Sequence, residues 1–404
     1  MSHDSSRAYT IVIVGAGTAG ATVAARLRRA GARDVALVDP DDWHYYQPLW
    51  TLAGGGRADV QDSRRPRSGL VPRGVSWIQD AAVGVDPERR TVQLRDGGEV
   101  SYRQLVMAPG LQLDWTKIPG LAQTIGSNGT SSNYRFDLAP RTWDLIRATR
   151  SGTAVFAMPS GPIKCAGAPQ KIAYLAADHW RREGVLGDID VHLVLPMPGM
   201  FGIPKFAQIL ADTAAGYGIT VHLSSEISSV DGPGRTVTIR SLVTGRTSEI
   251  EYTMAHLVPP QSAPDWVKSS ALADPSDPGG YVDVDQHTLQ HRRYPDVFAL
   301  GDVAGTPSSK TGAAVRHQAP VVVRNMLDAW RGRELTGRYD GYASCPLTLS
   351  HRRLLLAEFD YSMQPAPSNP LPWPDTTEPL VDFNQLKKTG LPLMYWHGML
   401  RGLV

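Results

Sequence analysis

The sequence of 404 residues predicts an α/β fold with two Rossmann-like, three-layer domains and a further C-terminal region. Three observations lead to this prediction. A short apolar strand at residues 9–15 runs into a glycine-rich turn and a helix. A second alternation of strands and helices begins at Thr153, and a buried strand at residues 297–302 returns to the pattern of the first unit.

The predicted elements divide the chain into three parts. The first unit is expected to contain strands at 9–15 and 35–39, a helix at 18–30, and a hairpin with arms at 91–94 and 99–108. The second is expected to contain strands at 153–158, 191–196 and 219–224, helices at 169–183 and 204–216, and a hairpin with arms at 237–242 and 249–257. We therefore expect a discontinuous first domain (1–112 and 281–331), a second domain (113–280) and a C-terminal region (332–404).

A glycine fingerprint lies where the first strand turns into the first helix. Gly15 permits the tight turn, Gly17 lets a pyrophosphate approach the backbone, and Gly20 allows close packing of helix on strand. The free N–H groups and positive dipole end of the helix favour the same phosphates. Asp39 ends the second strand about 20 residues later, at the spacing of a carboxylate that binds a ribose hydroxyl. The first domain is therefore predicted to bind a dinucleotide.

Two further segments indicate which dinucleotide binds. The strand that ends in Gly301-Asp302 resembles the second flavin fingerprint of the pyridine nucleotide–disulfide oxidoreductase superfamily, and residues 106–110 resemble its middle motif. The resemblance implies FAD, with Asp302 bonded to the ribityl chain and Gly110 and Gly301 among the cofactor-binding residues. Lys310 is a candidate to face the flavin pyrimidine. A helix-capping role for Asp302 is the structural alternative.

The second unit departs from a nicotinamide-binding pattern after its first strand. A relative that uses NADH would carry a second Gly-x-Gly-x-x-Gly sequence there, but the chain has Pro159 and Pro162. Proline removes a backbone donor and fixes φ, so the phosphate cradle is compromised. Cys165 stands in the same segment. This difference argues against a nicotinamide electron donor and for a donor that acts through sulfur.

The chain has only two cysteines, Cys165 and Cys345. Two widely separated thiols exclude a disulfide scaffold, and two unrelated buried thiols are the ordinary alternative. The context of Cys165 favours a reactive thiol, because a predicted helix start and the positive charges of Lys164 and Lys171 lower a thiol pKa. The context of Cys345 is less informative. Together with the altered nucleotide segment, the cysteines indicate a redox pair.

Composition argues against several other classes of protein. With 41 Lys and Arg against 39 Asp and Glu, the formal net charge is +2, which offers no overall attraction for nucleic acid. The histidines show no metal-ligand spacing, so no metal is expected. No apolar run reaches the length of a membrane span, and Met1–Tyr9 has no feature of a signal or transit segment.

Several longer segments then point to a family. They closely resemble segments of sulfide:quinone oxidoreductases of the mitochondrial type and their bacterial relatives. The segments are 44–50, 161–171, 289–295, 339–347, 357–361 and 395–396. The resemblance covers nearly the whole chain. It implies noncovalent FAD, oxidation of hydrogen sulfide to persulfide or sulfane sulfur, and transfer of two electrons to quinone. Family members that attach FAD covalently use a cysteine for which this chain has no spare.

The resemblance also implies roles for individual residues. Cys165 is the flavin-side cysteine and Cys345 receives the sulfur, while Lys171 and Lys387 match active-site lysines, with Lys388 as an alternative to its neighbour. Hydrosulfide would attack the bridge at Cys345, leaving a persulfide there and releasing the Cys165 thiolate, which reduces FAD. A small acceptor (sulfite, glutathione, coenzyme A or more sulfide) would then remove the outer sulfur.

The C-terminal region is expected to face quinone and the membrane. Candidate quinone contacts are Phe359, Tyr361, Tyr395 and Trp396, although aromatic residues at such positions are more often core. Residues 391–404 are apolar with Trp, Tyr, His and Arg, which favours a segment lying on a membrane surface, and core packing is the alternative. The expected location is peripheral, on the cytoplasmic face of a bacterial membrane.

Three other functions are compatible with parts of the pattern. A type II NADH:quinone dehydrogenase would share fold, FAD and acceptor, but the prolines after the second domain's first strand and the cysteines disfavour it. The flavin subunit of an exported sulfide dehydrogenase usually carries covalent FAD. A flavin-binding redox sensor or scaffold without turnover is the alternative of a different class, and the cysteine pair speaks against it.

Overall fold

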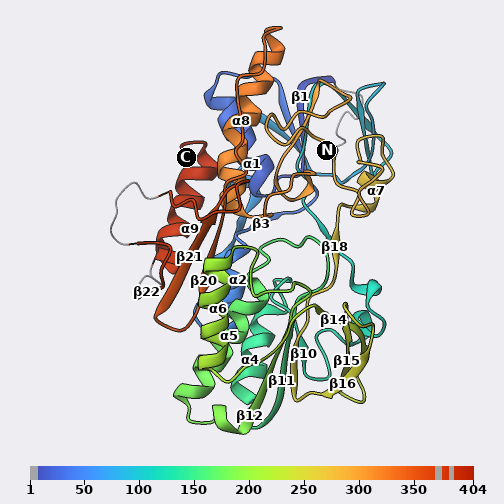
Figure 1. The fold of residues 1–404 in the computed structure, drawn as a ribbon. Coiled ribbons are helices and arrows are strands. Elements are labelled where there is room, and N and C mark those ends of the chain that lie inside the picture. Colours follow the sequence, from blue (N-terminus) through green and yellow to red (C-terminus); the bar gives the residue numbers. More distant parts are fainter. Residues whose placement is uncertain (1–7, 369–374, 382–385) are drawn as a thin grey trace.

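The computed structural model describes residues 8–368, 375–381 and 386–404. The start expected to lack a targeting segment falls mainly on residues 1–7, outside the described residues. Figure 1 shows two sheet-containing units, one above the other, with the C-terminal strands and helical tail beside them. The upper unit combines the blue start of the chain with the orange helix α8, and the lower one is green to yellow. This arrangement confirms the predicted α/β class with Rossmann-like units.

The first sheet has seven strands. The glycine fingerprint follows directly on the carboxyl end of its strand β1. Its parallel strands follow the order β5-β2-β1-β8, and β19 also pairs with β8, so the chain returns to this sheet after the second unit. The strands β6 and β7 extend it by antiparallel pairing. The bounds are β1 Ala8–Val14, β2 Val35–Val38, β5 Val75–Ile78, β6 Ala82–Asp86, β7 Thr91–Leu94, β8 Glu99–Met107 and β19 Val297–Ala299.

Two helices of the first unit pack on each other, α1 (Thr18–Arg29) and α8 (Gly312–Trp330). Most buried residues of α1 are small, Ala19 among them, while Gly20 packs against Gly15 and Ile13 at the end of β1. The start of α8 is capped by Thr311, whose Oγ1 accepts a hydrogen bond from the N–H of Ala314 at 3.1 Å. Both helices therefore begin close to the predicted cofactor residues.

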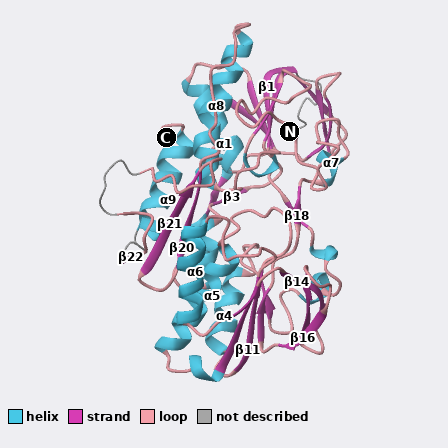
Figure 2. Ribbon diagram, viewed as in Figure 1, coloured by secondary structure: helices cyan, strands magenta, loops and turns pink. Residues whose placement is uncertain are grey.

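The second sheet has five parallel strands in the order β10-β17-β11-β12-β13. Their bounds are β10 Thr130–Ser131, β11 Gly152–Ala157, β12 Ile189–Val194, β13 Thr220–His222 and β17 Met254–His256. Figure 2 shows helices α4 (Ala139–Ala148), α5 (Ala168–Arg182) and α6 (Pro204–Gly216) on one side of it. An antiparallel sheet of β14 (Ser225–Asp231), β15 (Thr236–Ser241) and β16 (Thr247–Glu251) lies on the other, which completes three layers.

One predicted strand, 249–257, is wrong as a single element. Its first half belongs to β16 in the antiparallel sheet, and its second half is β17 in the parallel sheet. Burial explains the division. All three residues of β17 are buried, as a strand between two others in a covered sheet requires, whereas β16 is mostly exposed.

The C-terminal region forms a small antiparallel sheet and a helical tail. The sheet contains β20 Ala343–Thr348, β21 Arg353–Phe359 and β22 Leu380–Val381. The tail contains successive turns of π, α and 3-10 type at Leu386–Gly390, Leu391–Leu393 (α9), Met394–Gly398 and Met399–Arg401. None of the helices in the described part of the chain is long and apolar enough to cross a membrane.

Short elements complete the described part of the chain. The strands are β3 Trp43–Tyr45, β4 Arg64–Pro66, β9 Gln112–Leu113 and β18 Gln261–Ser262. The α-helices are α2 Pro48–Gly54, α3 Leu121–Thr124 and α7 Asp265–Lys268. The 3-10 turns are Val60–Ser63, Arg67–Gly69, Trp115–Lys117, Leu186–Asp188 and Gly301–Val303.

The tail packs into the first unit through its aromatic residues. The Tyr395 hydroxyl lies 2.8 Å from Thr18 Oγ1 on α1 and 2.5 Å from His44 Nε2. The buried side chains of the tail are Tyr395, Trp396, Met399 and Leu400. In contrast, Leu393 and Leu403 are exposed. One face of the tail is therefore core, and the other remains exposed.

We expect Trp396→Ala to destabilise the whole first unit. Truncating a buried tryptophan costs about 3–5 kcal/mol, a large part of the stability of an ordinary domain. Thermal unfolding followed by circular dichroism and by FAD release should both move to lower temperature. Leu403→Ala, an exposed position of the same tail, is the control and should change stability by less than about 0.5 kcal/mol. Equal effects of the two substitutions would contradict the described packing.

Candidate active site

The two cysteines meet at the junction of three parts of the chain. Cys165 lies in the turn between β11 and α5, and Cys345 lies in β20. Their Sγ atoms are 3.8 Å apart, and the structure contains them as free thiols. Cys345 is buried and Cys165 partly buried. This separation allows thiol–thiolate contact, and disulfide formation requires only a small approach.

Two lysines flank the pair, both predicted from the sequence. Lys171, on the first turn of α5, places Nζ 3.0 Å from Cys165 Sγ and 3.9 Å from Cys345 Sγ. Lys387 is buried and donates hydrogen bonds to the carbonyl of Pro346 at 3.0 Å and to Thr348 Oγ1 at 2.8 Å. Its neighbour Lys388 is exposed and lines an open groove of about 420 Å³. The geometry therefore favours Lys387 over Lys388 at the site.

The thiols have opposite pKa shifts. Donation of a hydrogen bond by the Cys345 thiol and the charge of Lys171 lower the pKa of Cys165 well below its usual value, against the effect of burial. The same hydrogen bond, burial and the charge of the Cys165 thiolate raise the pKa of Cys345. In the reduced pair the Cys165 thiol therefore ionises before the Cys345 thiol, and the first negative charge resides on Cys165.

The two lysines also have opposite pKa shifts. Burial lowers the pKa of Lys171, but the cysteines outweigh burial and raise it above its usual value. Burial and the charge of Lys171 lower the pKa of Lys387 well below its usual value. Lys171 is thus the fixed cation of the site, while Lys387 is able to give up a proton.

The backbone at Cys165 is strained, with a φ of 50° that is unusual for a residue with a side chain. Its N–H donates to the carbonyl of Lys310 at 2.9 Å. The hydroxyl of Tyr134 donates to the carbonyls of Lys164 at 3.0 Å and of Cys165 at 3.3 Å. Sequence reasoning missed Tyr134, because it lies outside every recognised motif and reaches the site only through the fold.

The glycine fingerprint has the shape that a dinucleotide requires. Gly15 has a φ of 94°, and a Cβ there would lie 2.2 Å from the carbonyl oxygen of Ala108. A Cβ on Gly20 would lie 1.8 Å from the carbonyl oxygen of Gly15. A Cβ on Gly17 would meet nothing within 4 Å, so the backbone is open on the side where the pyrophosphate is expected. These residues fit the cofactor that the sequence predicts.

Asp39 is fixed at the end of β2 by two partners. Its Oδ2 accepts a hydrogen bond from the N–H of Ala16 at 2.6 Å, and its Oδ1 pairs with Arg67 at 3.1 Å. Burial raises the pKa of Asp39, and the Arg67 charge acts in the opposite direction. Arg67 is a second residue that the sequence did not reveal, because nothing in a loop arginine indicates which carboxylate it will meet.

The second flavin fingerprint forms a buried charged group. Asp302 lies inside the 3-10 turn Gly301–Val303, whose N-cap is Leu300, and Thr311 caps α8, so Asp302 caps neither element. Lys310 donates from Nζ to the carbonyls of Asp302 at 2.7 Å and Ala304 at 3.1 Å. Burial lowers the pKa of Lys310 to about 8, although Asp302 opposes this shift. Burial raises the pKa of Asp302, against the charges of Lys310 and Lys164.

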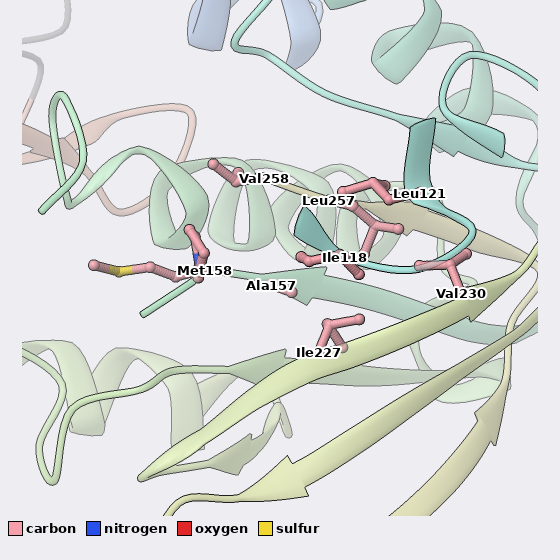
Figure 3. A pocket seen from close by; sticks show the side chains of 9 residues that line it. Ile118, Leu121, Ala157, Met158, Ile227, Val230, Leu257 and Val258 are labelled. Carbon is pink, nitrogen blue, oxygen red and sulfur yellow. The ribbon is translucent and has the colours of Figure 1, made fainter. Parts of the chain in front are cut away.

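The second domain has no room for a nucleotide at the small cavity beyond β11. Figure 3 shows this cavity, of about 10 Å³, between the end of β11 and the antiparallel strands. Its lining is apolar and includes Ile118, Ala157, Ile227 and Leu257. Cofactor sites commonly measure about 300–1,000 Å³ and place polar groups on the ligand. The cavity therefore gives no support to a nicotinamide site at this position.

The four predicted quinone-binding aromatics lie in separate groups. Tyr395 and Trp396 surround His44 and Tyr46, with ring centroids of Tyr46 and Tyr395 4.5 Å apart. Phe359 instead packs edge-on against Phe201, and Tyr361 packs against Tyr339. Within the described residues, no ring contact joins the two groups.

Comparison with known proteins gives the same assignment as the site. The family model described as pyridine nucleotide-disulphide oxidoreductase matches residues 9–319. The mitochondrial sulfide:quinone oxidoreductase of Mus musculus is 37% identical over 98% of this chain and 87% of its own. Its namesake in Dictyostelium discoideum is 37% identical over 97% and 86%. The crystal structure of the sulfide:quinone oxidoreductase from Aquifex aeolicus superposes with a TM-score of 0.79 and covers 98% of this chain and 92% of that chain. At 19% sequence identity, this likeness shows a shared fold.

These relatives correct one prediction and confirm another. The expected location on the cytoplasmic face of a bacterial membrane is wrong, because the relatives that match nearly the full chain are mitochondrial proteins of eukaryotes. The predicted family is confirmed by the identity and the coverage together. The chain belongs to the sulfide:quinone oxidoreductases, within the pyridine nucleotide-disulphide oxidoreductase family.

Proposed function

We propose that this enzyme oxidises hydrogen sulfide with FAD and passes the electrons to a quinone, with Cys165 and Cys345 as its redox pair. The observation that carries the proposal is the thiol pair itself, with Sγ atoms 3.8 Å apart and Lys171 Nζ 3.0 Å from Cys165. The named activity of the mitochondrial relatives supports the same reaction. FAD, when bound, takes up two electrons from the thiols and hands them to quinone.

We propose that residues 1–112 and 281–331 hold FAD, that 113–280 form the second domain, and that 332–404 supply Cys345 and the quinone side. Gly15, Gly17 and Gly20 would receive the pyrophosphate and Asp39 a ribose hydroxyl. The flavin end would lie among Gly110, Gly301, Asp302 and Lys310. Figure 1 supports this division, because the orange α8 lies with the blue start of the chain in the upper unit, the lower unit is green to yellow, and the C-terminal strands and tail lie beside the two units.

The order of events follows from the thiol pKa values. In the oxidised enzyme hydrosulfide attacks Cys345, the Cys165–Cys345 bond breaks, and Cys345 carries the persulfide. Cys165 leaves as the thiolate because Lys171 and the partner thiol stabilise its charge. Removal of the outer sulfur by an acceptor returns Cys345 to a thiolate, and closing the bridge again releases two electrons. Lys387 would supply and take back the proton during these steps, as its lowered pKa allows.

The acceptors and the membrane contact belong to the same proposal. The outer sulfur would pass to a small anionic or thiol nucleophile such as sulfite, glutathione, coenzyme A or a second sulfide. Quinone would approach through the aromatic residues of the C-terminal region, with Tyr395 and Trp396 on the side of α1. The exposed side chains of Leu393, Leu403 and Val404 offer an apolar contact for a membrane surface.

Anaerobic titration of the flavin spectrum tests the function. Sulfide, which in this titration also serves as the acceptor of the outer sulfur, should bleach the flavin, and NADH should leave it oxidised. Bleaching by NADH and not by sulfide would instead identify a type II NADH dehydrogenase. Steady-state turnover with sulfide and a short-chain quinone separates the enzyme from a non-catalytic flavin-binding sensor, which would bleach once and stop.

We expect FAD to be bound without a covalent bond, because both cysteines are occupied in the redox pair. Precipitation with acid should release all of the yellow colour into the supernatant. The Cys165→Ser and Cys345→Ser variants are the controls and should release it equally. Flavin that stays with the pellet in the parent protein would contradict the expectation.

A further inference from the structure

A buried side-chain amide whose nitrogen has no hydrogen-bond partner within the described residues lies next to the strained Cys165 backbone. Gln261 is 5% exposed, and its Oε1 accepts a hydrogen bond from the N–H of Lys164 at 3.0 Å. A backbone N–H is only a donor, so the atom that faces it is the amide oxygen, and the orientation of the amide is fixed. The Nε2 atom at the other end is buried and has no hydrogen-bond partner in the part of the chain that the structure describes. Such unpaired buried donors are rare in folded proteins and call for a ligand or an explanation.

Gln261 lies where three flavin-binding segments converge. Its strand, β18, pairs with β9, which follows directly on Gly110. Its hydrogen-bond partner Lys164 forms a backbone bridge with Lys310. The Lys310 side chain in turn donates to the carbonyl of Asp302. Gln261 is therefore connected, through its strand and through Lys164, to segments assigned above to the flavin end of FAD.

We propose that Gln261 is a positioning residue that joins the redox cysteine to FAD. Its oxygen holds the Lys164–Cys165 backbone, and its N–H groups bind an acceptor atom of the flavin ring. The proposal rests on the proposed function, since it takes FAD as the ligand. With Tyr134 on the carbonyls and Gln261 on the preceding N–H, the strained conformation of Cys165 is held from both sides. Bound FAD and the placement of Cys165 then stabilise each other.

Two substitutions separate the two ends of the amide. Gln261→Glu keeps an acceptor for the N–H of Lys164 but loses the donor, and Gln261→Met loses both. Both should release FAD about tenfold faster, because a buried hydrogen bond to the cofactor is gone. In a Cys345→Ser background, only Gln261→Met should also weaken the long-wavelength thiolate–flavin absorption. Gln261→Glu should retain that absorption and make the flavin potential more negative, since a carboxylate replaces an N–H donor.

Gln104→Met is the matched control. Gln104 is 6% exposed and donates from Nε2 to the carbonyl of Met326 at 3.0 Å, in β8 of the first unit but outside the residues assigned to FAD. It should lower the melting temperature and leave both flavin readouts at the parent values. The holoenzyme is used throughout, with FAD release followed by fluorescence and potentials set with dithionite and a reference dye.

The outcomes decide between the possibilities. Parent-like FAD release and absorption in both Gln261 variants would overturn the proposal. So would equal changes in Gln261→Met and Gln104→Met, because the amide would then have only a structural role. None of these measurements uses sulfide, so a parent enzyme that binds FAD but is not bleached by sulfide would refute the proposed function and leave this test intact. If one Gln261 variant fails to fold, the other still decides.

Discussion

Replacing Cys345 by Ser is expected to reduce sulfide oxidation to below about one-thousandth of the parent rate, because the atom that receives the sulfur is lost. The remaining Cys165 thiolate is still stabilised by Lys171, 3.0 Å away, and by a hydroxyl donor at position 345. This variant should therefore show long-wavelength thiolate–flavin absorption as purified. Stopped-flow spectra with sulfide under anaerobic conditions measure both effects.

Cys165→Ser is the complementary variant. It should also stop sulfide-driven reduction, but without any thiolate–flavin absorption, because the cysteine that the proposal places on the flavin side is removed. Both variants should keep FAD, since neither cysteine belongs to the glycine fingerprint. Near-parent turnover in Cys345→Ser would show that the pair is not the catalytic unit.

Lys171→Met is expected to slow sulfide-dependent flavin reduction about 100-fold, the usual cost of removing one preorganised charge from a reacting centre. Lys171 lowers the pKa of Cys165, so its loss raises that pKa. In the Cys345→Ser background the thiolate–flavin absorption should then be weak at neutral pH and grow as the pH rises. Without the Lys171 substitution the absorption should persist to lower pH than in Lys171→Met.

Two further variants show whether the effect comes from the charge at this place. Lys171→Arg keeps a cation and should restore part of the absorption at neutral pH. Lys205→Met removes an exposed lysine of α6 whose Nζ pairs with Glu378 at 2.9 Å and contacts Thr377, and neither contact involves a cysteine. This control should leave the pH profile unchanged. A pH profile of Lys171→Met identical to that of the parent would mean that Lys171 does not stabilise the thiolate.

The sequence by itself determined the α/β class, the FAD fingerprint and the identity of the two cysteines. These features are local: a strand, a glycine turn and a helix are fixed by neighbouring residues, and a pyrophosphate cradle needs Gly15, Gly17 and Gly20 within one turn. The family resemblance extended the reading to Lys171 and left Lys387 and Lys388 as alternatives. Local patterns could not choose between them, because adjacent lysines have the same sequence context.

Only the tertiary structure decided which groups meet. Cys165 and Cys345 approach to 3.8 Å because β20 packs beside the start of α5, a contact between distant parts of the chain. The same packing buries Lys387 and exposes Lys388. It also divides residues 249–257 between two sheets, because only residues 254–256 are buried on both faces. Tyr134 and Gln261 reach the backbone of Cys165 and Lys164 through such long-range packing. Packing energies depend on three-dimensional neighbours that a one-dimensional pattern does not specify.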